Sequence, residues 1–178
     1  MEGKKNIVFG FLYFVVTAVT GLIMTSGGML GEAGQAKQEA VKKVGVLEDR
    51  LDTGGPELAS AAGEAVTAIE GWLQAQGRVG EMAGGPHTHG NLEAMINIVA
   101  GLFLGMLAAP VALKQLISWL FILGAVLHSG MLYLGGIFGM SWAWAVVSLN
   151  LGPIALLGGL LVAGIAAIMS YRPRAAST

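Results

Sequence analysis

Four long apolar runs, separated by polar stretches, dominate the pattern of the chain. They cover Ile7 to Met24, about Leu92 to Leu113, about Leu116 to Phe138, and about Trp142 to Met169. A helix needs about 20 mostly apolar residues to cross a lipid bilayer. Because backbone polar groups must be satisfied internally in lipid, we expect an all-α protein, an integral membrane four-helix bundle.

A long polar segment separates the first apolar run from the second. Residues 32–51 and the residues after Pro56 show apolar positions at steps of three and four, which is typical of amphipathic helices. The breaker DTGGP lies between them. The pattern therefore predicts an antiparallel helical hairpin whose apolar faces meet along two stripes: Val41, Val44, Leu47 and Leu51, and Leu58, Ala62, Val66, Ile69 and Leu73.

These patterns divide the chain into three parts. Residues 1–30 form transmembrane helix 1, residues 31–85 form the helical hairpin, and residues 86–178 form transmembrane helices 2–4. Two interpretations of the hairpin stay open, a solvated spacer and a docking surface for another subunit. Trp72, beside the apolar stripe, favours docking because aromatic residues are enriched at interfaces.

Composition supports the membrane assignment and limits the chemistry. The chain is 54% hydrophobic and 12% charged, with a mean hydropathy of +0.69, whereas a soluble domain carries about 25% charged residues. There is no cysteine, which excludes disulfides, thiolate-bound zinc, iron–sulfur clusters and covalently attached c-type haem. The net charge of −1 gives no indication of nucleic-acid binding.

The basic residues predict the orientation. They flank the apolar runs at Lys4, Lys5, Lys114, Arg172 and Arg174. Four spans place all five on one side, which the positive-inside rule makes cytoplasmic. We therefore expect a protein of the cytoplasmic (inner) membrane with four spans, both termini cytoplasmic and the net-acidic residues 31–90 extracytoplasmic.

The stretch GGPHTHGNLEAMIN, residues 84–97, holds two of the three histidines and Glu93. Its two glycines predict a break, after which Pro86 suits the first turn of a new helix. In that helix His89, Glu93 and Asn97 recur every four residues and share one face. A histidine and a carboxylate at this spacing can reach one metal ion. Alternatively, His87 and His89 are solvated surface residues and Glu93 favours the positive end of the helix.

Two further polar residues interrupt the later apolar runs. His128 lies in the third run and Asn150 in the fourth, just before Pro153. Counted from the outer ends, Asn97, His128 and Asn150 lie at a similar depth of about 10–15 Å, at ~1.5 Å per residue. For Asn97 and Asn150 we favour intramembrane polar contacts between helices, and for His128 a bound haem or metal. The GxxxG match at 101–105 predicts a close helix contact.

Beyond these patterns, HTHGNLEAMINIVAGLFLG resembles the histidine-pair helix HxHxNLxGxxxxxxxG of the haem–copper oxidase subunit I superfamily. The nitric oxide reductase-like and cbb3-like members, and small four-helix proteins that look like excerpts of them, are the most similar. GFLYFVVTAVTGLIM resembles the preceding helix, and SWLFILGAVLHSGMLYLGG the following one. The resemblance implies that His87 and His89 ligate haem or lie beside a metal centre, with His128 as a partner. With three histidines in place of at least six, it does not imply a complete dinuclear centre.

The leading hypothesis is a small subunit of a membrane redox complex of the respiratory type, rather than a stand-alone enzyme. It would bind a b-type haem, copper or zinc near the outer face through His89 and His128. His87 and Glu93 would be alternate ligands or partners that contact the ligating histidines. The alternative is a cofactor-free accessory subunit that stabilises a larger membrane complex. A third class is a homo-oligomer whose site forms between copies. Expected partners are other membrane subunits, reached through the four helices and the hairpin, and the lipid bilayer.

Overall fold

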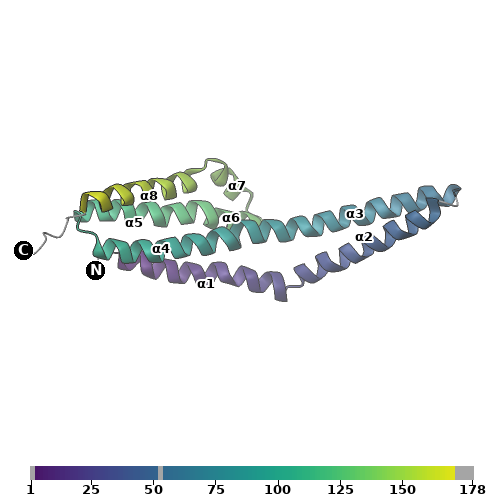
Figure 1. Cartoon of the computed structure of the whole chain (residues 1–178), viewed down its shortest axis with the longest axis horizontal. Helices are drawn as coiled ribbons and strands as arrows, with labels where there is room; N and C mark the ends of the chain where they lie inside the picture. Colours follow the sequence, from purple (N-terminus) through teal and green to yellow (C-terminus); the bar gives the residue numbers. More distant parts are fainter. Residues whose placement is uncertain (1–2, 52–53, 171–178) are drawn as a thin grey trace, which may run out of the picture. The chain divides into compact units, whose positions relative to one another are not determined.

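A computed structural model describes residues 3–51 and 54–170, and every regular element in these residues is helical (Figure 1). The all-α expectation is thereby confirmed. The elements are α1 (Lys4–Ser26), α2 (Met29–Leu51), α3 (Pro56–Met82), the π-helix η1 (Ala83–His89), α4 (Gly90–Met106), α5 (Val111–Ala125), the π-helix η2 (Val126–Gly130), α6 (Met131–Gly136), α7 (Ser141–Ser148) and α8 (Leu151–Ser170). They fall into two units, one of Val19–Gly84 and one of the chain up to Ala18 and from Gly85 onward.

Three helical stretches in the described residues are long and apolar enough to cross a membrane. They are Lys4–Leu51, which includes α1, Val111–Gly136, and Leu151–Ser170. These stretches match the first, third and fourth apolar runs. The second run forms α4, which has 17 residues and carries Asn91, Glu93 and Asn97. At 17 residues, α4 is shorter than the about 20 residues that a spanning helix needs.

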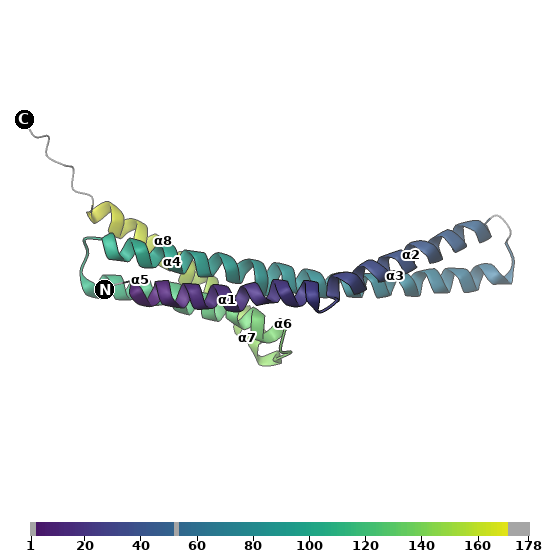
Figure 2. The same cartoon turned by 90° about the horizontal axis from the view of Figure 1, so that it is seen from below.

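In the unit Val19–Gly84, α2 and α3 run antiparallel and side by side (Figures 1 and 2). Their ion pairs join Glu32 to Arg78 at 3.9 Å and Lys43 to Glu64 at 2.7 Å, and Arg50 contacts Glu57. A small buried cluster joins Met24 of α1 to Ala33 of α2 and to Ala75 and Val79 of α3.

The face through which α2 and α3 meet differs from the one predicted. Alanines are buried along it, at Ala33, Ala40, Ala61, Ala65 and Ala75. The predicted stripes instead leave Val41, Leu51, Val66 and Leu73 at least half exposed. Alanine gives little apolar area, but it lets two helix backbones approach closely, and the expectation based on the larger side chains missed this.

In the other unit, α1 packs antiparallel to α4 through glycines. A Cβ at residue 10 would lie 2.7 Å from the carbonyl oxygen of Ala94. A Cβ at residue 101 would lie 2.7 Å from the carbonyl oxygen of Gly3. Such distances mean that the two backbones are in direct contact, so Gly101 of the GxxxG match does lie at a close helix contact.

The helices α5 and α8 pack antiparallel in the same unit. Gly124 lies against Leu156, and Gly159 lies against Phe121. The core that these helices share with α4 contains Ala100, Leu104, Leu107, Ile117, Phe121, Leu156, Ala163 and Ala166. Because this core joins α4 to α5 and α8, it fixes the helices that carry Glu93 and His128.

Two expected boundaries differ in the structure. The run from Trp142 to Met169 is two helices, not one, because Asn150 has a φ of 54°, in the left-handed region that ends α7. Pro153 then lies in the first turn of α8, where a missing N–H is tolerated. The break expected at Gly84 and Gly85 is absent, since η1 connects α3 to α4 with no non-helical residue between them.

One end of this unit gathers basic and polar residues. Lys5 donates to the Oε1 atom of Gln115 at 2.5 Å, and its Nζ lies 4.2 Å from the ring centre of Trp119. Ser170 donates to the carbonyl of Ala108 at 3.0 Å. The first residues of α1, the start of α5 and the last residue of α8 therefore lie at the same end. Arg172 and Arg174 lie outside the described residues.

Candidate metal centre

The two π-helical turns carry all three histidines of the chain. His87 and His89 belong to η1, and His128 belongs to η2. A π-turn holds one more residue than a regular turn, so it changes the direction of the side chains that follow, and such turns are frequent at functional sites. In η1 the turn accommodates Pro86, which has no N–H to give to a regular helical ladder.

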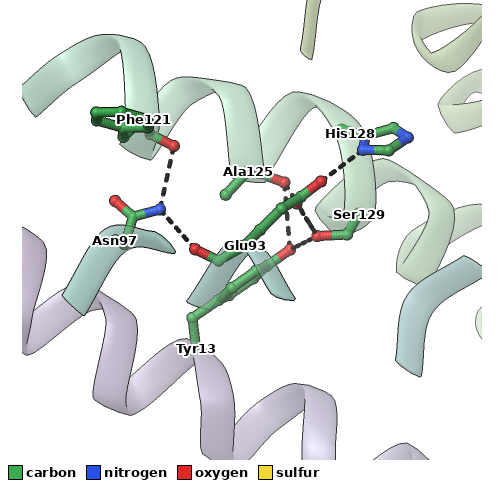
Figure 3. A network of polar contacts seen from close by, with 7 residues as sticks. All are labelled: Tyr13, Glu93, Asn97, Phe121, Ala125, His128 and Ser129. Atoms are coloured by element: carbon green, nitrogen blue, oxygen red, sulfur yellow. Dashed lines mark hydrogen bonds and ion pairs between the residues drawn. The ribbon is translucent and has the colours of Figure 1, made fainter. Parts of the chain in front are cut away.

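Glu93, one turn into α4, is the centre of a buried polar network (Figure 3). Its side chain is 3% exposed. The Oε1 atom lies 2.5 Å from Nδ1 of His128, and the Oε2 atom accepts a hydrogen bond from the hydroxyl of Ser129. A buried carboxylate is strongly destabilising unless it is paired and hydrogen-bonded. Both oxygens of Glu93 are satisfied by two successive residues of η2.

A second layer supports this contact. The hydroxyl of Tyr13, on α1, lies 2.7 Å from the Oγ atom of Ser129 and 3.3 Å from the carbonyl oxygen of Ala125. The Ala125 carbonyl stands directly before the π-turn, where the helical hydrogen-bond pattern changes. Three helices, α1, α4 and the helix containing η2, therefore meet at Glu93.

His89, Glu93 and His128 together form a group that can hold a metal ion. Each offers one ligand atom, and these atoms all lie within 4.8 Å of one another. The rings of His89 and His128 have centroids 4.9 Å apart, with their planes tilted by 60°. Because ligand atoms lie about 2 Å from a bound zinc ion, a modest side-chain rotation brings them to one ion. His89 is exposed and the side chain of His128 is 19% exposed, so the group opens outward.

His87 is directed elsewhere. Its Nδ1 atom lies 3.2 Å from the carbonyl oxygen of Thr17 and 3.4 Å from the amide nitrogen of Asn91. The hydroxyl of Thr17 in turn donates to Oδ1 of Asn91 at 2.7 Å. His87 thus contacts α1 and α4, and it is not a member of the group formed by His89, Glu93 and His128.

Asn97 lies in a second buried network, one turn below Glu93. Its amide nitrogen donates to the carbonyls of Glu93 at 3.0 Å and Phe121 at 3.2 Å. Asn6 donates to Oδ1 of Asn97 at 3.0 Å and to the carbonyl of Ser118 at 3.1 Å. These bonds join α1, α4 and α5 and hold the turn of α4 that carries Glu93.

The structure does not bring Asn150 to this site. Asn150 is exposed between α7 and α8, and its amide nitrogen donates to the carbonyl of Ser148 at 3.2 Å. Its similar depth along the sequence does not place it beside Asn97, because the chain turns at that residue.

Sequence reasoning did not identify the residues that support the site, which are Asn6, Tyr13, Ser118 and Ser129. A signal for them exists. Each is a polar residue near or within an apolar run, and polar groups in membrane helices usually face the interior of the bundle. No protein-family model, curated protein or solved structure matches this chain.

Proposed function

We propose that this chain is a membrane protein that binds one divalent transition-metal ion, as a small subunit of a membrane redox complex. The imidazoles of His89 and His128 are the ligands, with the carboxylate of Glu93 beside them. The observation that carries the proposal is the group of three ligand atoms within 4.8 Å, held by two different helical segments. Imidazole ligands suit copper and zinc, and a carboxylate commonly accepts the second ring N–H of a ligating histidine.

The ring geometry supports an ion over a haem with two axial histidines. The centroids of His89 and His128 are 4.9 Å apart. A porphyrin bound by both histidines has to lie between the rings, and it separates them further than that. Copper bound by these residues would supply electron transfer, which would fit the redox role implied by the resemblance to haem–copper oxidases.

The proposed topology has four spans, with α4 as the second. The basic end near Lys5 and Lys114 is cytoplasmic by the positive-inside rule. His128 contacts Gly152 at the start of α8, whereas Ser170 at the other end of α8 contacts Ala108 beside the basic end. The metal site is therefore near the extracytoplasmic side. The α2–α3 hairpin is extracytoplasmic as well, and its exposed Val41, Val66 and Leu73 suit contact with another subunit.

The test is metal content on the full chain purified in mild detergent, combined with a reduced-minus-oxidised visible spectrum. We expect one copper or zinc ion per chain and no haem band. The variants His89→Ala and His128→Ala should lose the ion. His87→Ala is the matched control, because His87 lies nearby but outside the group, and it should keep the ion. Wild-type protein without stoichiometric metal, or loss of the ion in all three variants alike, contradicts the proposal.

The second candidate is a cofactor-free subunit that stabilises a larger membrane complex. One observation favours it. Glu93, His128 and Ser129 satisfy one another, and no buried side-chain polar atom in residues 3–51 and 54–170 lacks a partner. In that case the metal content of an intact, partner-containing preparation is zero, and His128→Ala still assembles with its partners.

A further inference from the structure

The contact between Glu93 and His128 uses one ring nitrogen and leaves the other for a ligand role. Nδ1 of His128 lies 2.5 Å from Glu93 Oε1. Figure 3 shows Nε2 on the side of the ring that points away from Glu93. A carboxylate accepts but does not donate when it is ionised. The bond therefore requires a proton on Nδ1. In the neutral ring, Nε2 then carries the lone pair that can bind a metal ion.

From this geometry we infer that Glu93 is a positioning residue and not a metal ligand. It accepts the Nδ1–H of His128 and thereby fixes the tautomer and the orientation of the ring, while Nε2 binds the ion. This inference rests on the proposed function. Metal-binding histidines generally donate their other ring N–H to a carboxylate, a carbonyl or water in this way.

Burial supports the assignment. The side chain of Glu93 is 3% exposed, whereas that of His128 is 19% exposed and His89 is exposed. An ion between the two imidazoles therefore lies on the outer side of the His128 ring, and the carboxylate lies on the inner side. For Oε1 to bind the ion directly, it would have to leave Nδ1, and the His128 ring would lose its acceptor.

The residues around Glu93 hold it in the same role. Ser129 donates its one hydroxyl proton to Oε2, so at 2.7 Å the phenol of Tyr13 is the donor to Ser129. The hydrogen bonds then run from Tyr13 to Ser129 to Glu93, and from His128 to Glu93. All of these donors converge on the carboxylate, which holds its two oxygens in place.

The assignment of the ligands also determines which coordination positions of the ion stay open. Only two imidazoles of this chain bind it, so the remaining coordination positions face the exposed side of the group. A four-coordinate zinc ion held by two protein ligands keeps two positions open, and open positions of zinc sites are taken by water or substrate. This site therefore accepts water or a small exogenous ligand.

The experiment compares wild type, Glu93→Gln and Ser129→Ala in detergent. Zinc affinity is measured by competition with a chelator, and the donor set by electron paramagnetic resonance of bound Cu²⁺. Gln keeps an acceptor for Nδ1–H but removes the charge. We expect Glu93→Gln to bind one ion about 10–100-fold more weakly, as for other partners of ligating histidines, with an unchanged Cu²⁺ spectrum. Ser129→Ala keeps the glutamate at position 93 and removes only one of its hydrogen-bond donors. It should therefore weaken binding less than Glu93→Gln does, again with the same spectrum.

The outcomes separate the two proposals. If wild type binds no ion, the proposed function fails, and this inference fails with it. If wild type binds an ion but the Cu²⁺ spectrum of Glu93→Gln shows the loss of an oxygen donor, Glu93 is a ligand and only the inference is wrong. Unchanged affinity in both variants also overturns it. Should Glu93→Gln fail to fold, the affinity and spectrum of Ser129→Ala test the inference: weaker binding with an unchanged spectrum supports it, and unchanged affinity overturns it.

Discussion

Gly152 lies directly against the backbone of His128. A Cβ at residue 152 would come within 2.5 Å of the His128 amide nitrogen and 2.6 Å of its Cβ. Close packing of this kind needs a glycine, because the backbone of a packed helix cannot move aside as the end of a flexible side chain can. The start of α8 is therefore one of the surfaces that position η2.

The first prediction follows from this contact. Gly152→Ala should destabilise the protein by about 1–3 kcal/mol, the usual effect of overpacking, and should weaken metal binding through displacement of His128. Gly158→Ala, on the same helix, is the control, since a Cβ there meets no atom within 4 Å. Thermal unfolding in detergent measures the difference. Equal melting temperatures for the two variants would show that the contact at Gly152 is not tight.

The second prediction concerns the buried amides of Asn6 and Asn97. Asn97→Leu keeps a similar shape but leaves the Asn6 amide without one acceptor. We expect a loss of about 1–3 kcal/mol, the effect of an unsatisfied buried polar group. Replacing both partners removes the unsatisfied group, so Asn6→Leu with Asn97→Leu should cost less than the sum of the single changes. Additive effects in unfolding titrations would contradict a direct interaction. Thr25→Ala, at an exposed hydroxyl that bonds only its own helix, is the control.

Much of the fold was accessible from the hydrophobic pattern. Apolar runs of membrane length predicted an all-α protein, and three of the stretches they mark in the described residues are long and apolar enough to span. The pattern did not predict the π-turns η1 and η2, because a π-turn is a single-turn change inside a helix and leaves the apolar run around it continuous. It also missed the division at Asn150, where one residue of unusual φ ends a helix within a continuous apolar run.

The candidate site was predictable in part, for a physical reason. The spacing of four residues between His89 and Glu93 spans one helical turn, and the structure places both beside His128. Ser129 and Tyr13 could not be found from spacing, since they reach Glu93 across helices far apart in the sequence. The similar depth predicted for Asn150 and Asn97 did not place Asn150 at the site. Equal distance along two helices does not bring their side chains onto facing surfaces.

The third prediction tests the turn at Asn150. Its φ of 54° is in a region that glycine and asparagine adopt readily and that β-branched residues avoid. Asn150→Gly should leave stability nearly unchanged, whereas Asn150→Val should destabilise by ~1–2 kcal/mol. Thermal unfolding of the two variants measures this. Equal stability of both would mean that residue 150 is not held in the left-handed conformation.

The fourth prediction tests the orientation, and the absence of cysteine from the chain makes it direct, since any introduced cysteine is the only one. Ser60 is exposed on α3, and Ala108 is exposed between α4 and α5, near the basic end. In intact cells a membrane-impermeant maleimide should label Ser60→Cys fully. Ala108→Cys should be labelled only after permeabilisation. The positive-inside rule makes this the expected result. The reverse pattern would invert the topology and move the metal site to the cytoplasmic side. Labelling of both positions from outside would mean that α4 does not cross the membrane as the second span.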